Sequence, residues 1–176
     1  MIEFFHKIID VLNKSNIPYM LSGSVAMGVY ILPRATRNFD FVVHLQSKDI
    51  DGFVANFQEG YYCSADAVKD AVKYPGLFNI IDHTSGYKAD FIILKNEEFR
   101  KEEFKRKVAM EYFDKTIYLV SAEDFLISKL IWIQELQSAI QMEDIKNLAQ
   151  LNTLDWPYIG VWLKKLKLKT FNLLEK

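Results

Sequence analysis

The stretch NFDFVV, residues 38–43, constrains the fold most, because its alternating side chains define a buried face and a polar face. Phe39 and Phe41 alternate with Asn38 and Asp40. A period of two residues is typical of a β-strand that is buried on one side. We therefore expect the two phenylalanines to pack inward against a layer of helices, and Asn38 and Asp40 to share the opposite face of a sheet.

The elements around this strand follow one another without the regular βαβ alternation of a doubly wound fold. That order favours an α+β class, with a largely antiparallel or mixed sheet flanked by helices. We expect an α/β core over about residues 1–120, a helical C-terminal part over about 121–176, and the active cleft between them. The pattern predicts strands over 19–23, 38–45, 61–63, 77–82, 87–94 and 116–120, helices over 2–14, 24–32, 48–57, 64–73, 121–137, 139–151 and 155–174, and a charged helix or loop over 96–107.

The composition limits the classes of function that need to be considered. The 22 Lys and Arg residues nearly balance the 23 Asp and Glu residues, so net charge does not indicate a nucleic-acid binder. Cys63 is the only cysteine, which excludes an internal disulfide and a cysteine-based zinc site. No apolar run reaches the roughly 20 residues of a membrane span, and no signal-peptide pattern is found. We therefore expect a cytoplasmic protein that does not enter a membrane.

A Gly-Ser pair, Gly23 and Ser24, stands between a short buried strand and a helix. Glycine lets the backbone come close to a ligand, and the free N–H groups at the start of a helix favour an anion such as phosphate. Ser24 adds a hydroxyl donor. The same pattern is also common as a plain turn with a helix cap.

Three polar side chains could meet around a cation near this turn. Asn38 and Asp40 project from one face of their strand, and Asp90 is the only carboxylate of the strand 87–94. Oxygen ligands of this kind hold Mg²⁺ or Mn²⁺, and Arg34 and Arg37 would place positive charge nearby. The alternatives are a solvated Asp40 at a strand edge and ordinary surface arginines.

The segments LSGSVAM, RATRNFDFVV, YKADFIIL, SAEDFLISKL and MEDIKNL occur in one order along the chain. Together they resemble the nucleotidyltransferase superfamily, which has the polymerase-β-like fold. The resemblance covers about residues 17–150. It is strongest to the small bacterial branch that includes minimal nucleotidyltransferases and AbiEii-type toxins of toxin–antitoxin systems.

The resemblance implies roles for residues that match the motif. Gly23 and Ser24 match the phosphate-binding turn, and Asp40 matches the second metal-binding aspartate. Asp90 matches the third aspartate, which acts as general base or positions metal for the incoming hydroxyl. Lys129 matches a lysine of the helical part that faces the nucleotide or the acceptor. Asp144 matches the acid of the last motif helix. The alternative for Lys129 is an ordinary surface cation.

Asn38 departs from the motif, because the family has an aspartate at this position that ligates both metals. An asparagine keeps an oxygen ligand but loses a full negative charge, so cation affinity should fall. Three readings remain open: an impaired enzyme, a substitution that traps substrate, and a surviving site with one tight metal.

The resemblance implies transfer of a nucleoside monophosphate from an NTP to a hydroxyl group of an RNA such as a tRNA, of a protein or of a small molecule. The alternative function is that of a nucleotide-binding or partner-binding module, impaired at Asn38, within a toxin–antitoxin pair.

Overall fold

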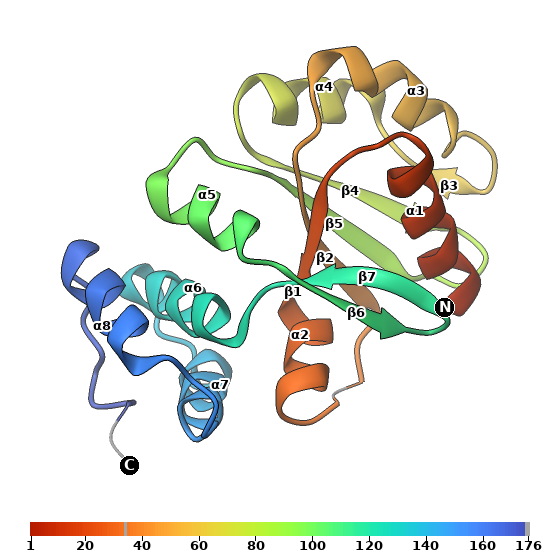
Figure 1. Cartoon of the computed structure of the whole chain (residues 1–176). Coiled ribbons are helices and arrows are strands. Elements are labelled where there is room, and N and C mark those ends of the chain that lie inside the picture. The colour runs from red at the N-terminus through yellow and green to blue at the C-terminus, as the bar shows by residue number, and fades with distance from the viewer. Residues whose placement is uncertain (34, 175–176) are drawn as a thin grey trace.

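The strands of the chain form one mixed sheet (Figure 1). We describe a computed structural model that covers residues 1–33 and 35–174. In this part of the chain, the sheet has seven strands in the order β3-β4-β5-β2-β1-β7-β6. The strands are β1 (Tyr19–Ser22), β2 (Asn38–Val43), β3 (Tyr61–Tyr62), β4 (Leu77–Asp82), β5 (Lys88–Ile93), β6 (Val108–Tyr112) and β7 (Lys115–Leu119).

The pairing directions of the strands confirm the predicted mixed sheet. β2 runs parallel to β5, and β1 runs parallel to β7. The remaining neighbours, β1–β2, β3–β4, β4–β5 and β6–β7, are antiparallel. In the strand order, β2 is central and β5 is its neighbour, and these two strands carry Asn38, Asp40 and Asp90.

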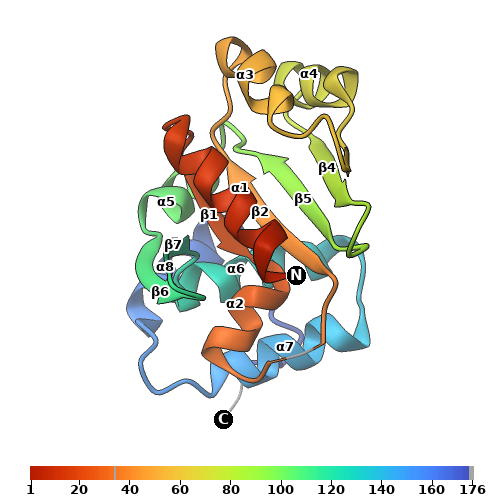
Figure 2. The ribbon, with the colours of Figure 1, turned by 90° about the vertical axis from the view of Figure 1, so that its right-hand side faces the viewer.

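Helices lie on both sides of this sheet (Figures 1 and 2). Helices α1, α3 and α4 lie on one side, and α6, α7 and α8 gather on the other. The helices are α1 (Ile2–Lys14), α2 (Gly23–Tyr30), α3 (Ile50–Ala55), α4 (Ala65–Lys73), α5 (Glu98–Lys105), α6 (Ala122–Glu135), α7 (Ala139–Ala149) and α8 (Trp156–Lys165). Among residues 1–33 and 35–174, none of the helices has both the length and the apolar character needed to cross a bilayer.

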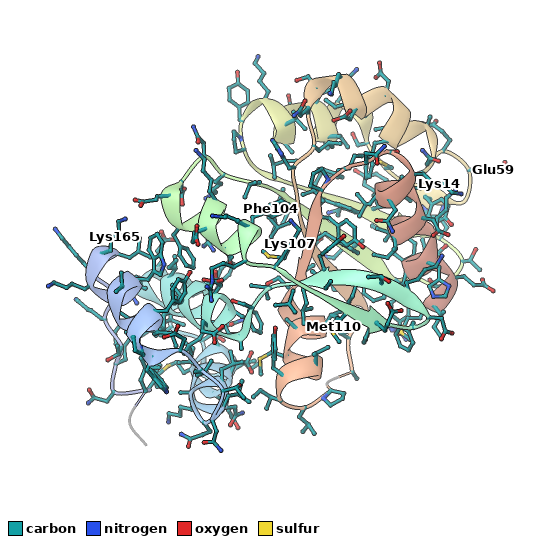
Figure 3. The ribbon with its side chains drawn as sticks, viewed as in Figure 1. Lys14, Glu59, Phe104, Lys107, Met110 and Lys165 are labelled. Atoms are coloured by element: carbon teal, nitrogen blue, oxygen red, sulfur yellow. The ribbon has the colours of Figure 1, made fainter. Side chains whose placement is uncertain are left out.

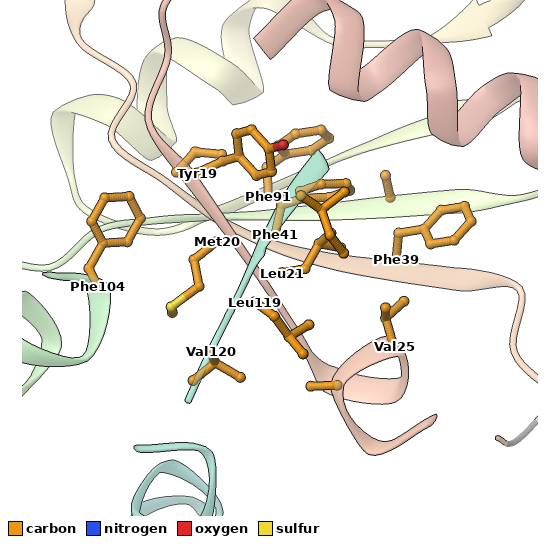
Figure 4. Close-up of a cluster of buried hydrophobic side chains, with 14 of the residues drawn as sticks. Tyr19, Met20, Leu21, Val25, Phe39, Phe41, Phe91, Phe104, Leu119 and Val120 are labelled. Carbon is orange, nitrogen blue, oxygen red and sulfur yellow. The ribbon is translucent and has the colours of Figure 1, made fainter. Parts of the chain in front are cut away.

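Aromatic side chains fill the space between the sheet and α1 (Figure 4). The rings of Phe41 and Phe91 stack at 5.2 Å, and Phe91 also stacks on Phe78 at 5.0 Å. Phe39 and Phe41 are 2% and 0% exposed, as the alternation predicted. Burial of these phenylalanines fixes which face of β2 turns outward, and with it the direction of Asn38 and Asp40.

Helix α5 joins the sheet to the helices that follow β7. Its Phe99 ring meets Trp162 of α8 edge-on at 5.1 Å, and Glu98 forms an ion pair with Lys165. Figure 3 shows Lys165 on α8, at the end of the molecule opposite Lys14. The division of the chain into units 1–120 and 121–176 stays a prediction.

Two secondary-structure predictions were wrong. The sequence reading missed β6, which forms a hairpin with β7. It also extended the last helix to residue 174, whereas α8 ends at Lys165. Lys167 is left-handed with φ of 52°, and the Leu168 N–H donates to the Leu163 carbonyl at 3.0 Å. This hydrogen bond is the one that closes a Schellman motif, in which a left-handed residue ends the helix.

Candidate functional site

A row of polar residues crosses four neighbouring strands at the centre of the sheet. Ser22 of β1 is opposite Asp40 of β2, and Asp40 is beside Asp90 of β5. Asn79 of β4 pairs with Asp90 on the other side. Residues in register on adjacent strands point to the same face. The two carboxylates that the sequence placed on separate strands are therefore direct neighbours.

Asn38 links the two carboxylates through its amide group. Its Nδ2 donates to Oδ1 of Asp40 at 2.9 Å and to Oδ2 of Asp90 at 3.0 Å. The structure thus brings together all three residues that were predicted to surround a cation. In this arrangement the Asn38 amide N–H groups donate to the two acids, whereas the sequence predicted that the Asn38 amide oxygen binds a cation.

Lys88 is a residue of the site that the sequence reading missed. It pairs with Asn38 in the register of β2 and β5, and its Nζ lies 3.0 Å from Oδ2 of Asp90. The signal was present in the sequence, because Lys88 precedes Asp90 by two residues on a strand and must share its face. Only the register could show that it also stands beside Asn38.

The turn between β1 and α2 packs directly against Asp40. Gly23 is left-handed with φ of +57°, and a Cβ atom placed on it would lie 1.9 Å from Oδ2 of Asp40. The backbone N–H of Ser24 donates to the Asp40 carboxylate. The predicted phosphate-binding turn and the predicted metal ligand are therefore in contact, and the glycine is required by both conformation and space.

The surroundings of Asp40 shift the pKa of its carboxyl group upward. Burial raises the pKa of this carboxyl above its usual value, and the charge of the nearby Asp90 raises it further. The Ser24 N–H, the Lys88 ammonium and the Asn38 amide act in the opposite direction without cancelling the effect. A raised pKa at a paired acid is common where a site is built to hold a cation or to move a proton.

Two oxygen atoms of this cluster lack a hydrogen-bond partner. Among the described residues, Oδ1 of Asn38 and Oδ1 of Asp90 are buried and unsatisfied. Such oxygens are rare in folded proteins, and a bound ion is one explanation for them. A half-turn about the Cβ–Cγ bond exchanges the amide donor and acceptor of Asn38. The donor set of two carboxylates and one amide oxygen therefore fits a hard divalent cation.

The site has two acidic residues, Asp40 and Asp90. Within residues 1–33 and 35–174, no group of three or more His, Cys, Asp or Glu side chains is placed to hold a metal ion. The reason is the asparagine at position 38. A cation here would have fewer negative ligands than in a site with three acids, and ligand charge is a main determinant of affinity.

A cavity of about 590 Å³ lies beside the start of α2. Ser24, Thr36 and Arg37 give its walls polar groups, while Phe39 and Tyr87 are two of its aromatic residues. The Thr36 hydroxyl accepts from the Asn38 backbone N–H at 3.0 Å, which connects the cavity wall to Asn38. Arg34, the other predicted arginine, lies outside the described residues.

Lys129 lies within the helical part. Its Nζ donates to Asp144 and to Gln141, both at 2.8 Å. Lys129 is 7% exposed and Asp144 is 2% exposed. The two residues matched to separate motif helices thus pair with each other and connect α6 to α7. A contact of Lys129 with a nucleotide stays a prediction.

Ser121 caps the start of α6. The Ser121 hydroxyl accepts from the Asp124 N–H at 3.2 Å and donates to the Asp124 carboxylate at 2.7 Å. Asp124 is fully buried and also accepts from Arg106 at 3.0 Å and from the hydroxyl of Tyr158 at 2.6 Å. This network of Arg106, Asp124 and Tyr158 joins the end of α5 to α6 and α8.

No family model and no curated protein matches the sequence. The structure, in contrast, is similar to solved structures. The lincosamide antibiotic adenylyltransferase LnuA, solved with lincomycin bound, superposes with a TM-score of 0.56 at 16% identity, over 84% of this chain and 95% of that one. The nucleotidyltransferase ANT(2″)-Ia, in complex with adenylyl-2″-tobramycin, superposes with a TM-score of 0.58 at 12% identity, over 94% of this chain and 96% of that one. With its mixed sheet and flanking helices, the chain has the nucleotidyltransferase fold.

Proposed function

We propose that this chain transfers a nucleoside monophosphate from an NTP to a hydroxyl group, using Mg²⁺ or Mn²⁺. The observation that carries the proposal is the register of β2 and β5, which sets Asp40 beside Asp90 and against the turn at Gly23. A carboxylate pair next to a helix start combines cation ligands with a phosphate site. The shared fold with two adenylyltransferase-like structures supports the same reaction class.

Each residue of the site has a role in this reaction. Asp40, Asp90 and the amide oxygen of Asn38 would hold the cation, which would lower the charge on the phosphates. Ser24 would hold a phosphate group at the start of α2, and Arg37, together with Arg34, would add positive charge. A phosphate at the start of α2 would lie next to Asp40, because the Ser24 N–H already contacts that carboxylate.

In the proposed step, the acceptor hydroxyl displaces pyrophosphate from the NTP. The acceptor oxygen forms a bond to the α-phosphorus, and the bond from that phosphorus to the β-phosphate bridging oxygen breaks. Pyrophosphate leaves with the electron pair of that bond. The proton of the acceptor hydroxyl passes to the carboxylate of Asp90.

The ligands of the similar structures support a small-molecule acceptor over a large one. The cavity beside Ser24, of about 590 Å³, has the volume of a usual ligand pocket, about 300–1,000 Å³, but Asp40 and Asp90 do not line it. The similar structures LnuA and ANT(2″)-Ia were solved with lincomycin and with adenylyl-2″-tobramycin. RNA, such as a tRNA end, and a protein side chain remain alternative acceptors. We place the reaction in the cytoplasm.

The proposal is tested by incubating the chain with each α-labelled NTP, beginning with ATP, and with Mg²⁺ or Mn²⁺. The acceptor pools are a small-molecule extract, total RNA and a protein lysate, each offered separately. We expect label to move to one pool with release of pyrophosphate. Absence of transfer from all NTPs to all pools would contradict the proposal.

One observation favours a second candidate function. The Asn38 amide already bridges Asp40 and Asp90, and the Lys88 ammonium pairs with Asp90. The carboxylates are therefore satisfied in part without a cation. A chain that binds a nucleotide or a partner without turnover, such as one member of a toxin–antitoxin pair, would be stable in this state.

Asn38→Asp separates the two candidates. If the chain is an enzyme, the natural sequence transfers label, and the variant transfers it about tenfold faster or more because the added charge strengthens cation binding. If the chain is a binding module, only the variant transfers label. Asn152→Asp is the control, because it makes the same substitution at an exposed position outside the site.

A further inference from the structure

Four side chains form a two-by-two arrangement on the outer face of β2 and β5. Asn38 stands beside Lys88, and Asp40 stands beside Asp90, two residues further along both strands. One row thus holds an amide and an ammonium group, and the next row holds two carboxylates. The parallel register makes all four side chains point to the same face.

Lys88 and Asn38 both engage the same oxygen of Asp90. Oδ2 lies 3.0 Å from the Lys88 Nζ and accepts from the Asn38 Nδ2 at 3.0 Å. The other oxygen, Oδ1, is buried and has no partner among the described residues. Of the two Asp90 oxygens, Oδ2 is therefore occupied by Lys88 and Asn38, and Oδ1 is the one that can bind a cation.

The charges of this arrangement limit how many cations it can hold. Two carboxylates and one ammonium group leave the four residues with a net charge of −1. One divalent cation changes this to +1, which the triphosphate of a nucleotide can balance. A second divalent cation would lie close to the Lys88 ammonium, with no acid at position 38 to attract it.

We propose that the Lys88 ammonium takes the place of a second cation, so that the chain binds one divalent cation on Asp40 and Asp90. Lys88 is then a positioning residue. It holds Oδ2 of Asp90 and leaves Oδ1 for the cation. The inference rests on the proposed function for the identity of the site, but its test measures cation binding and needs no turnover.

The Lys88–Asp90 pair differs from an ordinary surface ion pair in the burial of its acid. The Lys88 side chain is 41% exposed, but its partner Asp90 is only 13% exposed, and Asp90 belongs to the polar row. Lys115 and Asp10 offer a comparison, since they form a lysine–aspartate pair at 2.6 Å with exposures of 30% and 41%. That pair lies outside the polar row and serves as the matched control.

The test is a titration of the full chain with Mn²⁺ alone, in which electron paramagnetic resonance measures free Mn²⁺. We expect one site per chain in the natural sequence. Lys88→Met should keep one site and bind Mn²⁺ about tenfold more tightly, because a positive charge close to the cation is removed. The double variant Asn38→Asp with Lys88→Met should bind two Mn²⁺ ions. Lys115→Met should leave the titration unchanged.

Several results would overturn the inference. For the natural chain, these results are two Mn²⁺ sites or no Mn²⁺ binding. For the variants, they are unchanged or weaker Mn²⁺ binding by Lys88→Met, and a single Mn²⁺ site in the double variant. The outcome is separate from that of the transfer assay. A chain that shows the expected titration but never transfers label refutes only the proposed function. A chain that transfers label but does not respond to Lys88→Met refutes only the role of Lys88.

Discussion

Asp40→Asn is expected to abolish nucleotidyl transfer and, at neutral pH, to raise the unfolding temperature of the chain. The loss of transfer should be on the order of 10³-fold, since the site loses one of its two acids and a direct cation ligand. The stability of the folded chain at pH 7 should increase. The pKa of Asp40 is raised by burial and by the charge of Asp90, so the ionised carboxylate opposes folding and a neutral amide does not.

The sign of the stability change depends on pH. A group with a raised pKa in the folded state contributes stability that is present below its unfolded pKa, about 3.9, and lost as the pH rises through its folded pKa. The advantage of Asp40→Asn should therefore be seen at pH 7 and disappear near pH 4, which thermal unfolding at several pH values measures.

Asp10→Asn is the matched control for Asp40→Asn. The hydrogen bond and charge of Lys115 lower the pKa of Asp10. Its ionised form therefore contributes stability above the unfolded pKa, and this contribution is lost as the pH falls. Asp10→Asn should slightly lower the unfolding temperature at pH 7 and leave transfer intact. If Asp40→Asn keeps its activity, or loses stability at pH 7, our description of the site is wrong.

Gly23→Ala is expected to destabilise the fold and to disturb cation binding together. The left-handed backbone at φ of +57° costs an alanine about 1–2 kcal/mol. The new Cβ would also lie 1.9 Å from Oδ2 of Asp40, so the carboxylate must move. We expect a loss of at least about 2 kcal/mol in the free energy of unfolding, and cation binding weakened about tenfold or more. Urea unfolding and the Mn²⁺ titration measure the two effects.

Two other glycines separate the causes of this effect. Gly60 is left-handed with φ of +80° but has open space around its missing Cβ, so Gly60→Ala reports backbone strain alone. Gly52 lies in α3 with nothing within 4 Å of that position. Gly52→Ala should stabilise the chain by up to about 1 kcal/mol, as alanine favours a helix. If Gly23→Ala lowers the free energy of unfolding by no more than Gly60→Ala does, then the position of the Asp40 side chain does not depend on the turn at Gly23.

The local pattern of β2 was sufficient to predict that strand and its outward face. The alternation in residues 38–43 gave the buried phenylalanines and the shared face of Asn38 and Asp40, and both are confirmed. The end of α1 was also predicted. Asn16 is left-handed with φ of 52°, and the Ile17 N–H donates to the Leu12 carbonyl at 2.9 Å. These features depend only on residues close in the sequence.

The register between strands could not be read from the sequence. Asp40 and Asp90 are separated by 49 intervening residues, and their pairing depends on how β2 and β5 slide past each other. A shift by two residues would keep every side chain on its face but set Asp40 beside Lys88 or Ile92. The position of Lys88 beside Asn38 follows from the same register, and therefore escaped the sequence reading.

The missed hairpin has a local cause. The turn between β6 and β7 contains Phe113 and Asp114, both left-handed with φ of 46° and 59°. Hairpin turns of this type usually carry Asn-Gly or Asp-Gly, so Phe-Asp gave no signal. His6 of α1 contacts the Phe113 carbonyl through Nε2 at 2.6 Å. A tertiary contact thus helps to hold a turn that the local sequence does not favour.

The most direct test of the central claim is a crystal structure of the chain with Mn²⁺ and a non-hydrolysable ATP analogue, using anomalous scattering to locate manganese. We predict one anomalous peak, ligated by carboxylate oxygens of Asp40 and Asp90, with the triphosphate against the start of α2 at Ser24. A manganese peak away from these two aspartates, with the Asn38 amide still bridging them, would contradict the account.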